Sequence, residues 1–293
     1  MRRALITGVT GFLGRALARR LLGDGYELHA LARPGRSGSL EDLAGRVRVH
    51  DYDGRYGAVE TALEEAKPEL VLHLAALAPI AHEPGQIDEL LDADFALGCR
   101  LAEASWRRGT RVFINTGSFW QRRGGRAYDP VNLYAALKQA CEDALCFYAR
   151  ATDMRVATLT VYDVYGPSDP RAKLLSQLEQ ARRQGRRLDL SPGRQKLHMV
   201  YIDDAVEAFI KAARALESKP ALSGSTWAVR GLKPISVRSL VASYEKVAGP
   251  VPVRWGGRPY RAREVMRPWN GPLVPGWKPT VGLPEGLRRC LGS

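Results

Sequence analysis

A glycine-rich turn close to the N-terminus constrains the fold of this chain more than any other feature. The segment Thr7-Gly8-Val9-Thr10-Gly11-Phe12-Leu13-Gly14 follows an apolar run and precedes a stretch with helical periodicity. In a dinucleotide-binding turn the first glycine permits the sharp bend, the second lets the backbone approach a pyrophosphate, and the third lets the helix pack closely on the strand. The N-terminus of such a helix also offers free N–H groups and a partial positive charge to the phosphates. We therefore predict that a dinucleotide cofactor binds at Gly8, Thr10, Gly11, Phe12, Leu13 and Gly14.

Short apolar runs alternate with segments of helical periodicity through the first two thirds of the chain. The pattern predicts strands over residues 4–7, 27–32, 46–50, 70–75, 111–115 and 155–161, and helices over residues 11–22, 59–66, 87–107 and 134–151. Such alternation is typical of a parallel sheet with helices on both faces. The predicted fold class is α/β, a Rossmann doubly wound parallel sheet with a smaller C-terminal substrate-binding lobe. We assign residues 1–165 and about 199–220 to the NADP-binding domain, and residues 166–198 and 221–293 to the lobe.

Charge and cysteine content narrow the class of protein. The 293 residues carry 44 basic and 31 acidic side chains, a net charge of +13, and the basic residues are spread along the chain. No zinc-finger spacing or recognition-helix signature accompanies this charge, so we expect a phosphorylated small molecule as partner and no nucleic acid. Because the four cysteines form no C-x-x-C pair and the start lacks a secretory pattern, we expect reduced thiols in a cytoplasmic protein. No stretch reaches the about 18 apolar residues that span a bilayer, and the histidines lack ligand spacing, so we expect neither a membrane nor a metal site.

The end of the second predicted strand distinguishes between the two nicotinamide cofactors. An acidic residue there would hold the ribose 2′-hydroxyl of NAD, whereas an arginine would accept the 2′-phosphate of NADP. Here Arg33 ends the strand and Arg36 follows it, and a guanidinium group pairs with phosphate in bidentate geometry. We therefore predict NADP, used as NADPH, with NAD as the alternative. Asp51 and Tyr52, after the third strand, are candidate contacts for the adenine.

A phenol, an ammonium and two hydroxyls form the candidate catalytic group. Tyr134 and Lys138 are four residues apart on a predicted helix and so share one face. Thr116 and Ser118 follow the fifth strand, at the edge where ligands bind in open α/β sheets. We hypothesise that Thr116, with Ser118 as second choice, polarises a substrate carbonyl while Tyr134 donates a proton as general acid. Lys138 would lower the pKa of Tyr134 by its charge and hold the nicotinamide ribose.

These segments together resemble the extended short-chain dehydrogenase/reductase family, especially its nucleotide-sugar epimerase, dehydratase and ketoreductase branch. The resemblance covers nearly the whole chain and also includes His73-Leu74-Ala75-Ala76 and residues 161–167, 200–204 and 276–279. It implies a nucleoside-diphosphate sugar as substrate and a homodimer built on two helices of each subunit. It further implies that Leu74, Ala75 and Ala76 line the cofactor and that Arg261 holds the diphosphate or the base.

Departures from the family pattern narrow the expected reaction. Sugar 4,6-dehydratases follow the catalytic threonine with Asp-Glu, whereas Gly117 and Ser118 follow Thr116 here, which disfavours dehydration. Epimerases usually show the acidic residue after the second strand, which is missing here. We therefore expect NADPH-dependent reduction of a keto nucleotide-diphosphate sugar, of the 4-ketoreductase type. Residues 115–121 are similar to the enzymes that make CDP-linked sugars such as abequose.

Further departures concern the substrate-binding lobe. Asp163 occupies a place where many relatives use asparagine to contact the sugar diphosphate, and Leu197 stands where many carry an arginine. We expect Asp163 to contact the substrate and Arg194 or Lys196 to replace the missing arginine. Three alternatives remain open: an NAD-dependent nucleotide-sugar epimerase, a reductase that acts on a non-nucleotide carbonyl, and a non-catalytic NADP-binding sensor or scaffold.

Overall fold

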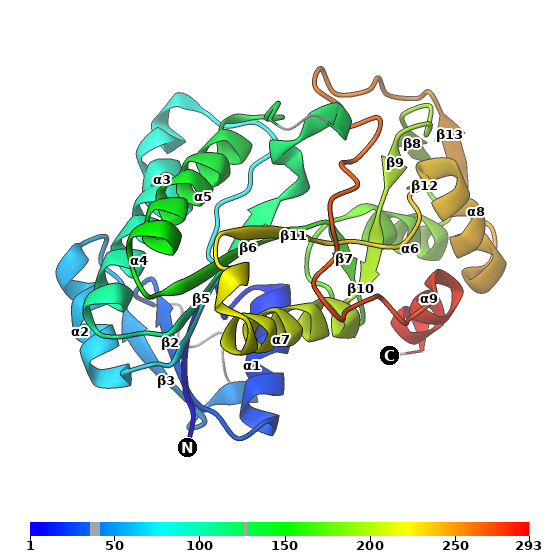
Figure 1. Ribbon diagram of the computed structural model, residues 1–293. Helices are drawn as coiled ribbons and strands as arrows, with labels where there is room; N and C mark the ends of the chain where they lie inside the picture. Colours follow the sequence, from blue (N-terminus) through cyan, green and yellow to red (C-terminus); the bar gives the residue numbers. More distant parts are fainter. Residues whose placement is uncertain (36–41, 126–127, 293) are drawn as a thin grey trace.

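A seven-stranded parallel sheet forms the centre of the molecule (Figure 1). The computed structural model describes residues 1–35, 42–125 and 128–292. The strand order is β11-β6-β5-β4-β1-β2-β3, and every neighbouring pair is parallel. The strands are β1 (Arg3–Thr7), β2 (Glu27–Ala32), β3 (Val47–Asp51), β4 (Leu70–His73), β5 (Val112–Ser118), β6 (Arg155–Val161) and β11 (Ser225–Val229). The order reverses between β1 and β4, so a crevice opens at their carboxyl ends, where open α/β sheets bind ligands. The predicted α/β Rossmann class is confirmed.

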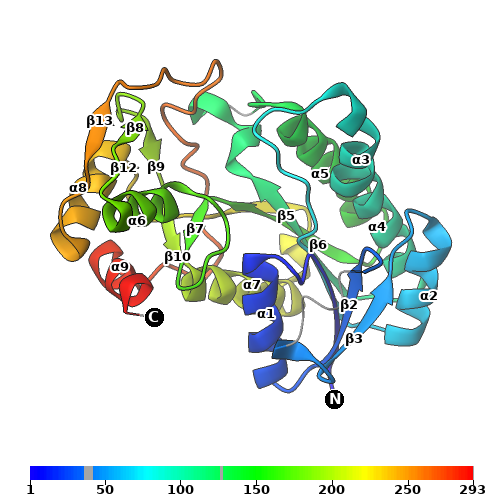
Figure 2. The ribbon, with the colours of Figure 1, turned by 180° about the vertical axis from the view of Figure 1, so that it is seen from behind.

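Helices cover both faces of this sheet, as the two opposite views show (Figure 1, Figure 2). One face packs against α1 (Phe12–Gly23) and α7 (Ile202–Ser218). The other packs against α2 (Tyr56–Ala66), α4 (Leu97–Arg107) and α5 (Leu133–Ala151). Side chains that alternate along a strand therefore belong to different cores: Ile6 joins the α1 and α7 side, and Leu5 joins the other.

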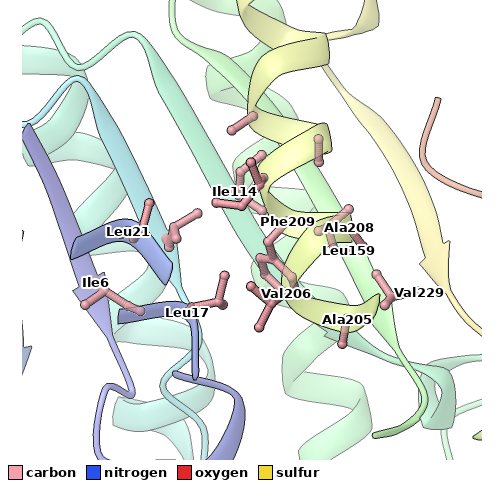
Figure 3. Close-up of a cluster of buried hydrophobic side chains, with 14 of the residues drawn as sticks. Ile6, Leu17, Leu21, Ile114, Leu159, Ala205, Val206, Ala208, Phe209 and Val229 are labelled. Carbon is pink, nitrogen blue, oxygen red and sulfur yellow. The ribbon is translucent and has the colours of Figure 1, made fainter. Parts of the chain in front are cut away.

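The core beneath α1 and α7 explains how the cofactor turn is anchored. Leu17 and Leu21 of α1 point toward the sheet residues Ile6 and Ile114, and Phe209 of α7 lies in the same cluster (Figure 3). All five of these side chains are fully buried. Burial of a large apolar side chain stabilises the fold by about 1.5–3 kcal/mol, so this packing holds α1, and with it the glycine turn that precedes the helix, against the face of the sheet.

The predicted helix over residues 87–107 is interrupted. It consists of α3 (Ile87–Leu91), a π-helical turn over Asp92–Ala96 and α4. The predicted strand over residues 70–75 ends at His73, because the Thr7 hydroxyl accepts hydrogen bonds from the N–H groups of Leu74 and Ala75 and so replaces the ladder.

A smaller lobe lies at the carboxyl edge of the sheet, as both views show (Figure 1, Figure 2). It contains three helices, α6 (Leu174–Gln184), α8 (Val237–Ala248) and α9 (Leu283–Leu291), whose apolar faces share a separate core. Its short strands pair as β8 (Leu188–Leu190) with β13 (Val253–Trp255) and β9 (Lys196–Leu197) with β12 (Ile235–Ser236). Where the lobe meets the main sheet, β7 (Asp163–Tyr165) pairs with β10 (Met199–Tyr201), and the buried side chains of both strands belong to the core of α1 and α7. Among the helices of the described ranges, none is both long and apolar enough to cross a bilayer.

One predicted boundary needs correction. Residues 221–293 were expected to belong to the lobe, yet β11 (Ser225–Val229) is the edge strand of the main sheet and pairs with β6 in parallel. Its inward side chains Trp227 and Val229 are buried in the same core as α7. The chain therefore enters the main sheet once more before it builds the last part of the lobe.

Candidate active site

The glycine turn forms a cradle that admits no side chains at two positions. Gly8 has φ +70°, and a Cβ there would lie 2.8 Å from backbone atoms of Leu74 and Ala75. A Cβ on Gly14 would lie 2.1 Å from the carbonyl oxygen of Gly8. Gly11, the N-cap of α1, supplies no side-chain cap, and the first turn of α1 contains no acid. The first N–H groups of α1 are therefore available to a diphosphate, and the residues present fit a dinucleotide.

The ends of β1 and β4 are tied together beside this cradle. Besides the two amides already described, Thr7 Oγ1 lies 2.8 Å from Nδ1 of the fully buried His73. These bonds set the backbone path of Leu74, Ala75 and Ala76, which were predicted to line the cofactor. The guanidinium group of Arg171 lies over the ring of Phe12, in the first turn of α1, at 4.7 Å from the ring centroid. This contact links the cradle to the lobe.

The residues predicted to select the cofactor lie at the carboxyl ends of β2 and β3. Arg33 is half exposed and forms an ion pair with Glu89 of α3. Asp51 is exposed, whereas Tyr52 is buried and its hydroxyl donates to Asp92 Oδ1 at 2.8 Å. Arg36, which follows Arg33 in the sequence, lies outside the described residues. The contacts to the 2′-phosphate and the adenine stay predictions, and Glu89 is a competitor for Arg33 that was not foreseen.

Tyr134 and Lys138 lie one turn apart at the start of α5. Asn132 caps this helix, because its side-chain oxygen accepts from the N–H of Ala135 at 3.1 Å. Lys138 is 1% exposed, and its Nζ has no hydrogen-bond partner among the residues that the structure describes. A buried ammonium without a partner is costly, so this atom is suited to hold a ligand hydroxyl.

The surroundings of the Tyr134 hydroxyl change its pKa. Burial raises the pKa of Tyr134 well above its usual value, the negative charge of Asp94 adds to this increase, and a hydrogen bond with Ser118 opposes it. The ring also packs edge-on against Trp120 at 6.2 Å between centroids. Tyr134 is therefore held as a neutral phenol, the form that can donate a proton.

The two hydroxyls at the end of β5 have different surroundings. Thr116 and Ser118 lie two residues apart on the strand and so face the same side of the sheet. Ser118 Oγ accepts from the N–H of Trp120 at 3.3 Å and also bonds Tyr134, whereas Thr116 Oγ1 is buried without a partner in the described part of the chain. Thr116 is thus the hydroxyl with free hydrogen-bonding capacity for a substrate oxygen.

A buried acid that the sequence reasoning missed lies close to this group. Asp94, in the π-helical turn, is fully buried, and both of its carboxylate oxygens accept from the N–H of Leu77, at 3.2 and 3.3 Å. Burial raises the pKa of Asp94 to about 7, against the opposing positive charge of Lys138. The available signal was an acid at helical spacing from Leu90 and Leu97, on an otherwise apolar stripe.

In the lobe, the structure brings Asp163 and Arg261 near one another. Asp163 begins β7, and its Oδ2 is buried without a partner in the described ranges. Burial raises the pKa of Asp163, while the positive charges of Lys173, Arg171 and Arg261 oppose the increase. The Arg261 guanidinium lies 5.9 Å from the ring centroid of Trp120, the residue that packs on Tyr134.

A cavity of about 460 Å³ extends from Asp163 between α6 and α9. Lys173 and Leu197 also line it, and burial lowers the pKa of Lys173 while Asp163 raises it. Arg194 and Lys196 are exposed and do not line this cavity. Lys173, which sequence reasoning missed, is therefore the cation that lies next to Asp163 in this cavity.

Comparison with known proteins identifies the family of this chain. The model of the NAD dependent epimerase/dehydratase family matches residues 4–223, three quarters of the chain. The chain belongs to this family. It is an extended short-chain dehydrogenase/reductase enzyme with a nicotinamide cofactor, so the predicted family is confirmed.

Individual relatives in this family carry out different reactions. CDP-abequose synthase of Yersinia pseudotuberculosis is 26% identical over 268 residues, covering 91% of each chain. UDP-glucose 4-epimerase of Mycolicibacterium smegmatis is 29% identical over 329 residues, covering 99% of this chain and 97% of the relative. The solved structure of the Thermus thermophilus UDP-glucose 4-epimerase in complex with NAD has a TM-score of 0.82 at 25% identity, covering 100% of this chain and 98% of that one.

The arrangement has the parts that a nicotinamide-dependent carbonyl chemistry requires. The Thr116 hydroxyl lies at the carboxyl end of β5, Tyr134 and Lys138 lie at the start of α5, and the glycine cradle follows the carboxyl end of β1. Within residues 1–35, 42–125 and 128–292, no three His, Cys, Asp or Glu side chains gather into a group that could hold a metal ion.

Proposed function

We propose that the protein is an NADPH-dependent reductase of a keto nucleoside-diphosphate sugar, of the 4-ketoreductase type. The observation that carries the proposal is the half-buried, neutral Tyr134 one helical turn from the buried Lys138, together with the unpartnered hydroxyl of Thr116 at the end of β5. A carbonyl oxygen placed between the two hydroxyls would receive one hydrogen bond and one proton. The absence of an acid at the end of β2, where Arg33 follows Ala32, supports NADP as the cofactor.

In this mechanism the chain's residues orient the substrate and move one proton. The glycine cradle would hold the cofactor, and NADPH bound there would supply the hydride that the carbonyl carbon receives. Thr116 donates a hydrogen bond to the carbonyl oxygen and polarises it. Tyr134 donates its phenolic proton to the same oxygen as negative charge develops there. Lys138 stabilises the resulting phenolate by its charge and holds the nicotinamide ribose through Nζ.

The lobe supports a nucleoside-diphosphate substrate. Asp163, with a free buried oxygen, can accept hydrogen bonds from a base or sugar, while Lys173 and Arg261 lie close enough to influence its pKa and can pair with phosphate. Arg261 also approaches Trp120, so a substrate held there would extend toward Tyr134. Two relatives, named for a CDP-linked and a UDP-linked sugar, favour this substrate class.

The proposal is tested with purified protein by following NADPH oxidation in the presence of 4-keto nucleotide sugars. We expect oxidation that depends on the substrate, and Tyr134→Phe should reduce kcat by about 10²–10⁴-fold because the proton donor is lost. Circular dichroism of Tyr134→Phe should match that of the wild type. Full turnover by Tyr134→Phe would refute the assignment of the proton donor.

An NAD-dependent nucleotide-sugar epimerase is the second candidate. Its support is the ion pair between Arg33 and Glu89, which occupies the guanidinium that would otherwise meet a 2′-phosphate, together with the epimerase relatives. Tightly bound NAD in the purified protein and interconversion of sugar epimers without net NADPH oxidation would favour it. Clear preference for NADPH in fluorescence titrations would favour the reductase.

We also propose a homodimer built on α4 and α5. Phe147 of α5 is 60% exposed and Trp106 of α4 is 38% exposed, and both rings contact Tyr148. Exposed aromatic residues on adjacent helices are typical of an interface. Light scattering should give twice the mass of one chain, and Phe147→Glu should shift the protein to the monomer. A wild-type protein that remains monomeric at high concentration would refute this arrangement.

A further inference from the structure

Asp94 occupies an interior position of a helical stripe that is otherwise apolar. Leu90, Leu97 and Leu101 lie on this stripe, and each is buried like Asp94 itself. Burying a carboxyl group costs free energy unless hydrogen bonds or an opposite charge compensate it. An acid at such a position therefore points to a role other than packing.

The backbone around Asp94 brings it against the catalytic helix. A π-helical turn, Asp92–Ala96, places it there, and such turns are frequent at functional sites. Gly98 lets α4 approach closely: a Cβ on Gly98 would lie 2.4 Å from Cys141 Sγ of α5 and 3.3 Å from His73 Nε2 of β4. The π-helical turn and α5 are consequently in direct contact.

The hydrogen bonds of Asp94 do not satisfy an ionised carboxylate. Among the residues that the structure describes, its two oxygens share a single donor, the N–H of Leu77, although a carboxylate can accept about four hydrogen bonds. Leu77 follows the segment predicted to line the cofactor, so this bond connects Asp94 to the loop after β4. When Asp94 is ionised, its negative charge must therefore be compensated by charged side chains nearby.

The titratable groups that face Asp94 come from α5. They are Lys138, whose charge lowers the pKa of Asp94, and Tyr134 and Cys141, whose pKa values Asp94 raises. His73 of β4 faces Lys138, and burial keeps its pKa well below the usual range, so His73 stays neutral. Asp94 therefore influences both the ammonium and the phenol of the proposed catalytic pair.

We infer that Asp94 is a positioning residue that acts through Tyr134 and Lys138, its negative charge holding the phenol in the proton-donating form and so committing the site to carbonyl reduction. This inference rests on the proposed function, because it concerns the direction of proton transfer at the same tyrosine. In the reverse reaction, oxidation of an alcohol, Tyr134 would have to accept a proton as phenolate. A negative charge beside the phenol opposes that ionisation. Asp94 exerts its full effect on Tyr134 only at pH values at which the Asp94 carboxyl group is ionised.

A first experiment measures the coupling in the protein without cofactor or substrate. Carboxyl ¹³C NMR follows the titration of Asp94, with Asp94→Asn used to assign its signal. We expect an elevated midpoint, near neutral pH, that rises further in Lys138→Met because a compensating positive charge is removed. A midpoint in the ordinary range for aspartate, or one that Lys138→Met leaves unchanged, would overturn the inference.

A second experiment measures the pH dependence of both reaction directions. Asp94→Asn should move the pH profile of alcohol oxidation to lower pH by roughly one unit, the size of the effect of one nearby charge. The exposed acid Asp88 on α3 provides the matched control, and Asp88→Asn should leave the profile in place. An unchanged profile in Asp94→Asn would overturn the inference even if the coupling to Lys138 exists.

Failure of the proposed function would be recognised separately. It would appear as absence of NADPH oxidation with every 4-keto nucleotide sugar tested, while the NMR titration would still report whether Asp94 and Lys138 interact. An epimerase needs Tyr134 as both base and acid. The negative charge of Asp94 would slow such an enzyme, because it disfavours the phenolate form that acts as the base. In an epimerase, Asp94→Asn should therefore accelerate the oxidation step, and unchanged epimerisation would count against the inference.

Discussion

Replacing Asp94 by asparagine should change the pH dependence of stability in a way that follows from its burial. Burial raises the pKa of Asp94 to about 7 in the folded protein, from an ordinary value of 3.8. Between these two pH values the folded protein binds more protons than the unfolded chain, so the free energy of unfolding falls as pH rises. The stabilising contribution is complete below about pH 4 and is lost as pH increases to about 7.

The size of the effect follows from the shift. About three pKa units correspond to about 4 kcal/mol at 1.36 kcal/mol per unit, and the side chain is fully buried, so solvent screening does not reduce this figure. Between about pH 5 and about pH 8, roughly 3 kcal/mol of this remains to be lost, because part of the decrease occurs at lower pH. An asparagine side chain cannot ionise, so the variant avoids the decrease.

The assay is urea unfolding of Asp94→Asn and wild type at several pH values, followed by circular dichroism. We expect the stability of the variant relative to the wild type to increase by about 3 kcal/mol from about pH 5 to about pH 8. Taking the difference cancels the contributions of titrating groups that do not interact with Asp94. The exposed Asp88→Asn should show a constant difference. A constant difference for Asp94→Asn as well would refute the reasoning that Asp94 is buried without adequate compensation.

The remaining predictions concern the cofactor site. Gly14→Ala should weaken NADPH binding by at least tenfold and destabilise the protein, because its Cβ would lie 2.1 Å from the Gly8 carbonyl oxygen, as fluorescence titration and urea unfolding would measure. Gly23→Ala in the same helix has open space around its Cβ and should instead stabilise by up to about 1 kcal/mol, and a comparable loss of binding there would argue against the steric explanation. Arg33→Ala should weaken NADPH binding by roughly tenfold and leave NADH binding unchanged, since a charge-assisted pair with the 2′-phosphate is lost. Glu89→Gln should strengthen NADPH binding, because it releases Arg33 from its ion pair, and equal effects on NADH would contradict both Arg33 predictions.

Local sequence patterns were sufficient for the fold class and for the cofactor turn. The bend at Gly8 and the close approach at Gly14 are properties of consecutive residues, so the spacing of the glycines predicts them. The alternation of apolar runs and helical segments likewise predicts a parallel sheet, because each strand is buried on both faces. Tyr134 and Lys138 share a helix, and their common face follows from helical geometry alone.

Features that depend on distant segments could not be predicted in this way. The prediction assigned β11 to the lobe, since its pairing with β6 joins residues far apart in the chain. Arg33 and Glu89 are 56 residues apart, and no local pattern indicates that they meet. Lys173 and Asp163 line one cavity and interact electrostatically, although no local pattern pairs them.

Asp94 shows most clearly what the sequence by itself determined and what only the tertiary structure decided. The sequence placed Asp92 and Asp94 in one predicted helix and supplied the apolar stripe of Leu90 and Leu97. The helical spacing of Asp94 from Leu90 and Leu97 indicates which acid turns inward, but not that a π-helical turn forms or which elements surround the carboxyl group. The tertiary structure buried Asp94 against α5 and left Asp92 to pair with Tyr52 at the edge. Periodicity is a property of neighbouring residues, whereas burial and charge environment depend on the other elements that pack against them.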